Sequence, residues 1–357
     1  MQMPVQMQAV ATMHALGFPR RKHQAVRACF PGGKVLFVNA VKHVPPGATL
    51  AVWGLPSLPG LASGVTVVHV EDGFLRSVGL GADWIRPVSW VVDSRGMYFD
   101  ARRPSDLEMI LASFDWGEDL LRRAAALRRR IVESGLTKYN VGKGEWLRPA
   151  GTRRVILVPG QVETDASIRH GSPQVRGNLD LLQRVRASNP DAYIVYKPHP
   201  DVVAGLRLRG TQEARAVDFC DELVVHVPMH HMLEHVDEVH VMTSLAGFEA
   251  LLRERKVVCY GQPFYAGWGL TQDVFPVARR TRRLSLDALV AGALILYPRY
   301  FTAQGRAGAT PEAALDDLQA WRARTGGGLS WWRRLLWRPV LQMLAWWEDG
   351  ARRRQVP

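Results

Sequence analysis

Three short segments of this chain place acids, cations and hydroxyls directly after apolar, β-branched runs. They are Val155–Ser167 (VILVPGQVETDAS), Tyr196–Asp201 (YKPHPD) and Thr243–Leu252 (TSLAGFEALL). Each run has the composition of a buried strand, and ligands of open α/β sheets bind outside the carboxyl ends of the strands. We therefore expect groups that grip an anionic nucleotide, or attack a sugar, to meet at one edge of a parallel sheet.

The loop that follows the first of these runs carries two carboxylates, Glu163 and Asp165. A carboxylate at this place is suited to act as a nucleophile on an anomeric carbon, because carboxylates accept glycosyl groups in double displacement. The competing interpretation is that Asp165 only caps a turn or a helix, as aspartate commonly does. Gln161 lies in the same loop and is a candidate contact to the nucleotide.

The second segment closes its strand with Lys197, His199 and Pro200 in the sequence KPHP. Its prolines stiffen the turn, and lysine and histidine side chains both donate hydrogen bonds to phosphate. A turn of this kind can also simply end a strand. Its place at a strand end, followed by an aspartate, favours a phosphate-binding function.

The third segment runs from a strand into a helix, and its small residues, including Gly247, leave backbone N–H groups open to an anion. The helix dipole adds to that attraction, and the Ser244 hydroxyl is a further donor. Glu249 has two interpretations. It either accepts hydrogen bonds from ribose hydroxyls or is simply a carboxylate favoured near a helix start.

Two further loops carry weaker signals. Glu71 and Asp72 leave an apolar strand of the first half and either face the same cleft from the opposite wall or, through a buried Arg76–Asp72 pair, shape their own loop. The segment Gly261–Thr271 (GQPFYAGWGLT) suits a sugar-stacking loop and a packed hinge equally well.

The elements that position these residues alternate between strands and helices. In the first half we expect strands at 34–40, 49–54 and 65–70, a hairpin over 89–100 that turns at 94–96, a helix after a Ser105–Glu108 capping box, and a helix over 120–134. In the second half we expect strands at 154–158, 192–196, 238–242 and 256–260, a loop over 160–171, a helix from an Asn178 cap to 188, a helix over 246–253, and later helices from Ser285 and Thr310. This alternation implies right-handed crossovers and parallel sheets.

Composition narrows the class of protein. A chain of 357 residues is long for one core, and a hydrophobic content of 47% indicates a packed globular protein. Its three cysteines have neither metal-ligand nor disulfide spacing, which favours a reducing compartment. We recognise no signal peptide and no spanning segment, so we expect a cytoplasmic protein that binds no nucleic acid.

The C-terminal tail is unusual, because the segment Trp321–Pro357 holds eight arginines and six of the twelve tryptophans. Arginine and tryptophan together suit a helix that lies on an anionic bilayer. The alternative is a helix that packs on the body of the protein with its arginines in solvent. We expect peripheral association with the inner face of the cytoplasmic membrane.

Taken together, these segments resemble the capsular polysaccharide β-Kdo transferases of the KpsC type. The resemblance rests on EDGFLRSVGLGA, VPGQVETDASI, NLDLLQRVR, YKPHPDV, DEVHVMTSLAGFEALL and YGQPFYAGWGLT, which occur in the same order over roughly Trp53 to Asp273. The match is close to the second of the two modules that members of this family carry in tandem, whereas this chain has one module.

The resemblance implies a GT-B-like α/β fold in which two Rossmann-like domains face each other across a cleft. We expect an N-terminal, acceptor-side domain over 1–150, a CMP-sugar-binding domain over 151–285, C-terminal helices that pack back on the body over 286–329, and a membrane-associating tail over 330–357.

The resemblance also implies transfer of β-Kdo with retention, from CMP-Kdo to a (lyso)phospholipid-linked Kdo acceptor, without a cofactor or metal. Asp165 then becomes the nucleophile of a covalent Kdo–enzyme intermediate, and Glu71 the acid/base. Lys197, His199 and Ser244 become phosphate ligands, and Glu249 a ribose contact. Alternatives are a nucleotide-sugar epimerase, a polyol-phosphate transferase, or a non-catalytic scaffold that recruits other capsule-assembly proteins.

Overall fold

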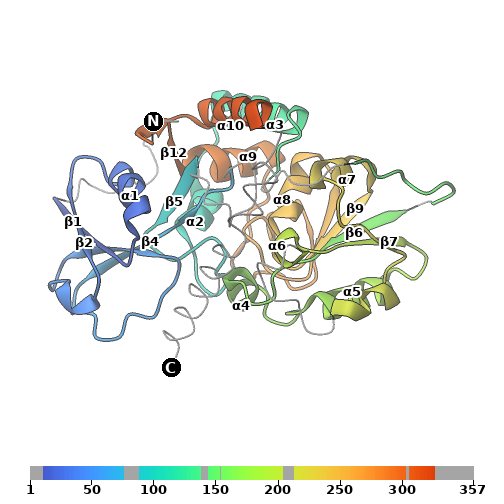
Figure 1. Cartoon of the computed structure of the whole chain (residues 1–357), viewed down its shortest axis with the longest axis horizontal. Coiled ribbons are helices and arrows are strands. Elements are labelled where there is room, and N and C mark those ends of the chain that lie inside the picture. The colour runs from blue at the N-terminus through green and yellow to red at the C-terminus, as the bar shows by residue number, and fades with distance from the viewer. Residues whose placement is uncertain are drawn as a thin grey trace.

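The computed structural model of this chain describes residues 11–75, 88–137, 144–152, 154–203, 213–302 and 305–325. Two β-sheets lie along the long axis of the molecule, with helices around and between them (Figure 1). The expected fold class, an α/β protein with two Rossmann-like sheets and a GT-B-like arrangement, is confirmed. Arg76, whose pair with Asp72 was one of two interpretations of its loop, lies outside the described residues, and so does the tail over 330–357, for which we expected membrane contact.

The first sheet combines N-terminal strands with two strands from the C-terminal part of the chain, in the order β13-β12-β5-β4-β3-β1-β2. These strands are β1 Thr12–Leu16, β2 Lys34–Val38, β3 Thr49–Trp53, β4 Thr66–Asp72, β5 Ser89–Asp93, β12 Pro298–Phe301 and β13 Ala307–Ala309. β1 to β4 are parallel, whereas β5, β12 and β13 each pair in antiparallel fashion. The segment 286–329 therefore contributes strands to this sheet as well as helices.

The second sheet is parallel throughout, in the order β11-β10-β9-β6-β7-β8. Its strands are β6 Val155–Pro159, β7 Tyr193–Lys197, β8 Glu222–Leu223, β9 Glu238–Val241, β10 Lys256–Cys259 and β11 Gln272–Asp273. β6 is buried along its whole length, which explains its continuous apolar sequence. From β6 the chain continues to β7 and β8 on one side of the sheet and then to β9, β10 and β11 on the other side. The strand order therefore reverses between β6 and β9, which is the topological switch point.

Helices cover both sheets. They are α1 His23–Cys29, α2 Asp106–Ser113, α3 Glu118–Glu133, α4 Ala166–Gly171, α5 Asn178–Ser188, α6 Pro200–Val203, α7 Met229–His235, α8 Leu245–Leu252, α9 Leu286–Val290 and α10 Pro311–Thr325, with short 3-10 turns at Arg20–Lys22, Val41–His43 and Glu213–Asp218 and a π-helical segment at Ala291–Leu296. The capping expected at α2 is confirmed, because the Ser105 hydroxyl accepts a hydrogen bond from the Glu108 N–H at 3.1 Å.

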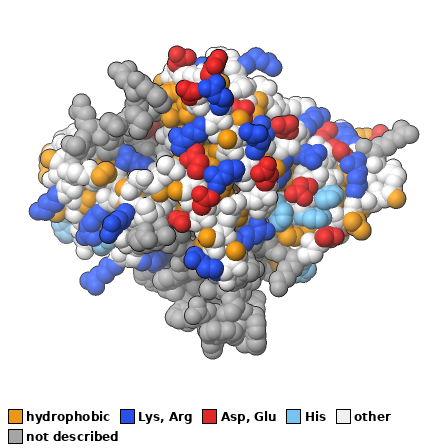
Figure 2. Space-filling view, turned by 90° about the horizontal axis from the view of Figure 1, so that it is seen from above, with side chains coloured by type: hydrophobic (Ala, Val, Ile, Leu, Met, Phe, Trp, Pro, Cys, Tyr) orange, Lys and Arg blue, Asp and Glu red, His pale blue; other side chains and the backbone are white. Residues whose placement is uncertain are grey.

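The arginine-rich helix α3 buries one stripe, formed by Leu120, Ala124, Leu127 and Ile131, and turns its arginines outward. Those arginines meet acids of other elements. Arg123 pairs with Glu312 of α10 at 2.7 Å, and Arg128 pairs with Glu254 at 2.8 Å and with Asp287 at 3.0 Å. Figure 2 shows acidic and basic side chains interleaved on the face of the molecule seen from above.

An aromatic cluster joins the two sheets. Phe74, which follows β4, stacks on Phe264 with ring centroids 4.4 Å apart and lies 6.1 Å from the ring of Phe248 in α8. Phe264, Tyr265 and Phe248 are all buried. Their burial decides between the two interpretations of the segment 261–271, because its aromatic side chains form packing between the sheets.

The hairpin expected over 89–100 is wrong. β5 ends at Asp93, and its neighbours in the sheet are β4 and β12. Asp93 explains the change of direction, because its Oδ1 accepts from the N–H groups of Arg95 and Gly96 at 3.0 and 2.9 Å, and its Oδ2 accepts from the Asp106 N–H at 2.9 Å. The chain is thereby directed into α2 instead of back along β5.

Two details around β6 also differ from expectation. The loop expected over 160–171 is shorter, because residues 166–171 form α4. Asn178 is the first residue of α5 and not its cap, a position held by Gly177. The Asn178 side chain instead accepts from the Gln161 N–H at 2.8 Å, and Glu163 Oε1 accepts from the Asn178 N–H at 2.7 Å.

Candidate active site

The carboxyl ends of β6, β7 and β9 meet at one edge of the second sheet. Pro159 and Lys197 are register partners, and the Gly160 N–H donates to the Lys197 carbonyl at 2.8 Å. A Cβ atom at position 160 would lie 2.6 Å from the Tyr196 hydroxyl oxygen and 3.2 Å from the backbone nitrogen of His199. Glycine, which has no Cβ, avoids this crowding. The expected convergence of the three segments is therefore confirmed.

Gln161 bridges the switch point between β6 and β9. Its Nε2 donates to Thr243 Oγ1 at 3.1 Å, and its Oε1 accepts from the Thr243 N–H at 3.0 Å. Both ends of the amide are thus used, and the side chain is 7% exposed. The Gln161 side chain thus joins two strand ends, and its predicted contact to the nucleotide stays a prediction.

Lys197 is a buried cation at the end of β7, with 7% of its surface exposed. Its Nζ donates to the Val225 carbonyl at 3.0 Å, and among the described residues it forms no ion pair. Burial lowers the pKa of Lys197 to about 8. A buried ammonium without a counter-ion is costly, so an anionic ligand at this place would be stabilising.

His199 and Pro200 follow at the start of α6. His199 Nδ1 accepts from the Asp201 N–H at 3.1 Å, which makes Nε2 the protonated, donating nitrogen of the neutral ring. Pro200 is the first residue of α6 and has no N–H to leave unsatisfied at that position. The turn therefore presents Lys197 and His199 from one rigid segment, as expected.

Helix α8 begins at the switch point, and Ser244 is its N-cap. The Ser244 hydroxyl accepts from the Ala246 N–H at 3.2 Å and keeps its own proton for donation. Gly247 is explained by packing, because a side chain there would collide with the Tyr265 hydroxyl, which itself donates to the Ser244 carbonyl. Glu249 is 8% exposed, one turn further along the helix.

Asp165 is exposed and caps α4, with Oδ1 accepting from the Ser167 N–H at 2.9 Å. The capping interpretation is thus correct for one oxygen. Oδ2 makes no hydrogen bond within the described residues. The charge of Asp165 also acts on Glu71, which belongs to the other sheet.

Glu71 lies at the carboxyl end of β4, and its Oε1 accepts from the Asp72 N–H at 3.1 Å. Burial raises the pKa of Glu71 to about 7, the charges of Asp72 and Asp165 act in the same direction, and Lys22 opposes them. Glu71 is therefore a carboxyl group that exchanges its proton near neutral pH. The interpretation that Glu71 faces the opposite sheet stays a prediction, which the effect of the Asp165 charge on Glu71 supports.

Two residues at the carboxyl edge of the first sheet, Lys22 and Trp53, were not predicted as site residues from the sequence. Lys22 lies in the turn after β1, with its Nζ 3.0 Å from the centroid of the Trp53 ring at the end of β3. The signal was weak because β1 is a five-residue strand, Thr12–Leu16, that we had not recognised. Without that strand, nothing indicated that Lys22 follows a strand end.

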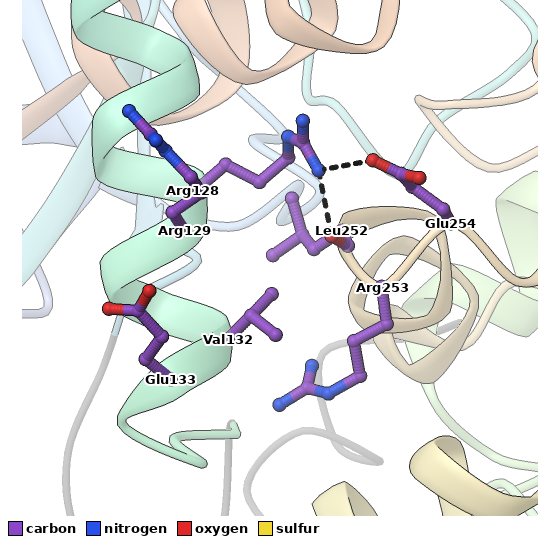
Figure 3. Close-up of a pocket in the computed structure, with 7 residues that line it drawn as sticks. All are labelled: Arg128, Arg129, Val132, Glu133, Leu252, Arg253 and Glu254. Carbon is purple, nitrogen blue, oxygen red and sulfur yellow. Dashed lines mark hydrogen bonds and ion pairs between the residues drawn. The ribbon is translucent and has the colours of Figure 1, made fainter.

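A surface pocket of about 220 Å³ lies elsewhere, between α3 and the C-terminal end of α8 (Figure 3). Arg128, Arg129 and Arg253 line it together with Glu133 and Glu254. Arg128 Nη1 bridges the two helices by donating to the Leu252 carbonyl at 3.4 Å and to Glu254 at 2.8 Å. None of the candidate site residues lines this pocket, which we therefore separate from the sheet-edge site.

The chain matches a family model described as "Capsule polysaccharide biosynthesis protein" over residues 61–119 and 116–302. It is 49% identical over 254 residues to the capsule polysaccharide modification protein LipA of Neisseria meningitidis, which covers 71% of this chain and 36% of LipA. It is 42% identical over 275 residues to the lipopolysaccharide-processing protein LpsZ of Rhizobium meliloti, covering 74% of this chain and 62% of LpsZ. The chain thus spans about a third of the length of its meningococcal relatives.

Two solved structures share the fold. The Thermosulfurimonas dismutans KpsC β-Kdo 2,7 transferase is 36% identical, with a TM-score of 0.72 over 87% of this chain and 99% of that one. The β-Kdo 2,4 transferase of the same protein is 31% identical, with a TM-score of 0.73 over 86% of this chain and 98% of that one. The two TM-scores are nearly equal, so overall shape does not distinguish the two linkages.

Proposed function

The chain belongs to the capsule polysaccharide biosynthesis family, and from that membership we propose that it is a retaining β-Kdo glycosyltransferase. The observation that carries this proposal is the pair of carboxyl groups, Asp165 and Glu71, contributed by the edges of two different sheets and within reach of each other's charge. A double displacement requires two carboxyl groups, one as nucleophile and one as acid/base.

In the first step, a carboxylate oxygen of Asp165 attacks the anomeric carbon of the Kdo donor. The bond from that carbon to the phosphate oxygen breaks, and CMP leaves with the bonding electron pair. In the second step, Glu71 takes the proton of the acceptor hydroxyl, whose oxygen attacks the same carbon and releases Asp165. Two inversions give overall retention.

The donor in this proposal is CMP-Kdo. Its leaving group carries one phosphate, which Lys197, His199 and the N-terminal end of α8 would neutralise. The support is that Lys197 is a buried cation with no ion pair among the described residues, beside the switch point where ligands of such sheets bind. On this proposal, these groups hold the phosphate without a metal ion.

The acceptor in this proposal is a Kdo residue on a phospholipid. An acceptor of this kind lies at a membrane surface, and the arginines and tryptophans of the segment 330–357 suit such a surface. No helix within the described residues is long and apolar enough to cross a bilayer. We propose that the tail binds anionic lipid headgroups at the cytoplasmic face of the membrane.

The proposed nucleophile is tested by intact-protein mass spectrometry after incubation with CMP-Kdo alone. We expect an adduct of one Kdo residue on a peptide that contains Asp165, and we expect Asp165→Asn to lose both the adduct and the transfer activity while it still binds CMP. The control is Glu163→Gln, the other carboxylate of the same loop, which can still accept from the Asn178 N–H through its amide oxygen. An Asp165→Asn protein that keeps normal turnover would contradict the proposal.

A further inference from the structure

The loop that carries Asp165 is bound to the start of helix α5 by one asparagine side chain. Asn178 is the first residue of α5 and is 1% exposed. Its Oδ1 accepts from the Gln161 N–H at 2.8 Å, and its Nδ2 donates to the Gln161 carbonyl at 2.9 Å. An amide can meet both backbone groups of one residue, because it carries an acceptor and a donor side by side. Gln161 is thereby held at both of its backbone hydrogen-bonding groups.

The backbone of Asn178 makes a third bond to the same loop. Its N–H donates to Glu163 Oε1 at 2.7 Å. The first N–H groups of a helix have no partner within the helix, and Gly177, the N-cap of α5, has no side chain to supply one. A Cβ atom at position 177 would lie 3.3 Å from Glu163 Oε1, so the glycine leaves room for the carboxylate. Residues 161 and 163 are thus both tied to one residue of α5.

Asp165 follows directly from these fixed positions. Its N–H donates to the Val162 carbonyl at 2.9 Å, and the Val162 side chain is buried. Asp165 itself is exposed and caps α4, which lies near the middle of the long axis of the molecule, whereas α5 lies further out (Figure 1). A shift of the backbone at Gln161 would therefore move the carboxylate that we propose as the nucleophile.

The loop is also tied to the two segments that we propose to hold the phosphate. The Gly160 N–H donates to the Lys197 carbonyl at the end of β7 at 2.8 Å. The Gln161 side chain bonds to Thr243, the residue before the N-cap of α8, through its Nε2 at 3.1 Å and its Oε1 at 3.0 Å. The place of Asp165 relative to these segments thus depends on where Gln161 is held.

We propose that Asn178 is a positioning residue, which holds the backbone of residues 160–165 so that Asp165 reaches the anomeric carbon of a donor whose phosphate is bound at β7 and α8. Asn178 is too deeply buried to contact the donor itself. It acts through geometry, and a displacement of about 1 Å can cost about 100-fold in rate. The inference rests on the proposed function, because it requires Asp165 to be the nucleophile.

The test measures the rate constant of adduct formation. Wild-type protein and Asn178→Ala are each mixed with saturating CMP-Kdo, quenched at increasing times and analysed by intact-protein mass spectrometry. In Asn178→Ala we expect the rate constant to fall about 10- to 100-fold, while the affinity for CMP, measured by calorimetry, stays close to that of the wild type. An asparagine that only stabilises the fold gives a different result, because a partly unfolded sample yields less adduct at an unchanged rate constant.

The matched control is Asn189→Ala. Asn189 is a buried asparagine at the other end of α5, and its Nδ2 donates to the Val185 carbonyl at 2.8 Å. Its replacement removes a buried amide from the same helix without touching the loop, so the rate constant should not change. Asn178→Asp is a second test variant for the case that Asn178→Ala yields little folded protein. It keeps an oxygen for the Gln161 N–H, loses the donor to the carbonyl, and should slow the same step.

Hydrogen exchange measures the loop without any substrate. The peptide that contains residues 160–165 should exchange faster in Asn178→Ala than in the wild type, because the Gln161 N–H loses its acceptor. In Asn189→Ala the exchange of this peptide should match the wild type.

A wild-type rate constant in Asn178→Ala, an equal fall in Asn189→Ala, or unchanged exchange of the loop peptide would overturn the inference about Asn178. A wild-type protein that forms no adduct on Asp165 would instead contradict the proposed function, and with it the purpose that we assign to Asn178. The two failures are distinguishable, since the first appears in the comparison of variants and the second in the wild-type protein alone.

Discussion

Nε of Arg280 donates to Oε2 of Glu108 at 2.9 Å, and both side chains are buried. Glu108 belongs to α2, which follows the first sheet, and Arg280 comes after the last strand of the second sheet. Nη1 of Arg280 also donates to the carbonyls of Pro263 and Ala266, at 2.6 and 2.9 Å. This ion pair therefore links the two sheets and holds the aromatic segment that packs between them.

Breaking this pair should destabilise the whole protein. In Glu108→Gln the buried guanidinium of Arg280 keeps its charge but loses its counter-ion, which typically costs about 3–5 kcal/mol. We expect that loss in the free energy of urea unfolding. Glu118→Gln is the matched control, because its pair with Arg122 is exposed and should contribute less than about 1 kcal/mol. Equal effects of the two substitutions would contradict a linking role for Glu108.

Lys197→Met should weaken CMP binding by about 10- to 100-fold, because it removes a charged donor to the phosphate. Isothermal titration calorimetry with CMP measures the change. Cytidine, which lacks the phosphate, serves as the control ligand and should bind both proteins equally. A parallel loss of cytidine affinity would mean that Lys197 supports the shape of the site instead of contacting phosphate.

CMP affinity should also depend on pH through Lys197. Burial lowers the pKa of Lys197 to about 8, so the cation is present below that pH and is lost as the pH rises through it. Bound phosphate favours the charged form, so the affinity should fall progressively above pH 8. Lys197→Met has no proton to lose at this position, and its CMP affinity should stay flat over the same range.

Gly247→Ala should disturb the start of α8. The new methyl group would meet the hydroxyl and ring of Tyr265, which is fully buried and bonded to the Ser244 carbonyl. We expect a loss of about 1–3 kcal/mol in unfolding free energy, as for other overpacked sites. Gly117→Ala is the control, since a side chain there meets nothing within 4 Å. Unchanged stability in Gly247→Ala would mean that Tyr265 moves freely.

Deleting residues 330–357 should abolish membrane binding without loss of chemistry. In a flotation assay we expect the full chain to move with phosphatidylglycerol vesicles and the truncated chain to stay behind. Phosphatidylcholine vesicles should bind both proteins weakly, because the arginines of the tail act through anionic headgroups. The truncated chain should retain activity on a soluble acceptor. Equal flotation of both chains would show that the tail packs on the protein.

The sequence predicted what depends on local pattern. Apolar runs followed by turn residues located β6, β7 and β9, and with them the edge at which Lys197 and Ser244 converge. This inference succeeds because the carboxyl ends of parallel strands must meet at one edge once the strands are identified. The capping serine of α2 was equally visible, since capping depends on residues a few positions apart.

Contacts between distant segments were decided by the tertiary structure alone. Gly247 packs against Tyr265 and Gln161 bonds to Thr243, which lie 18 and 82 positions away, and no local pattern indicated these contacts. The raised pKa of Glu71 likewise depends first on burial in the folded chain, and then on charges from other strand ends, of which Asp165 raises the pKa and Lys22 lowers it. A short-range pattern determines where a strand ends, but burial and charge at that end depend on neighbours that only the folded chain assembles.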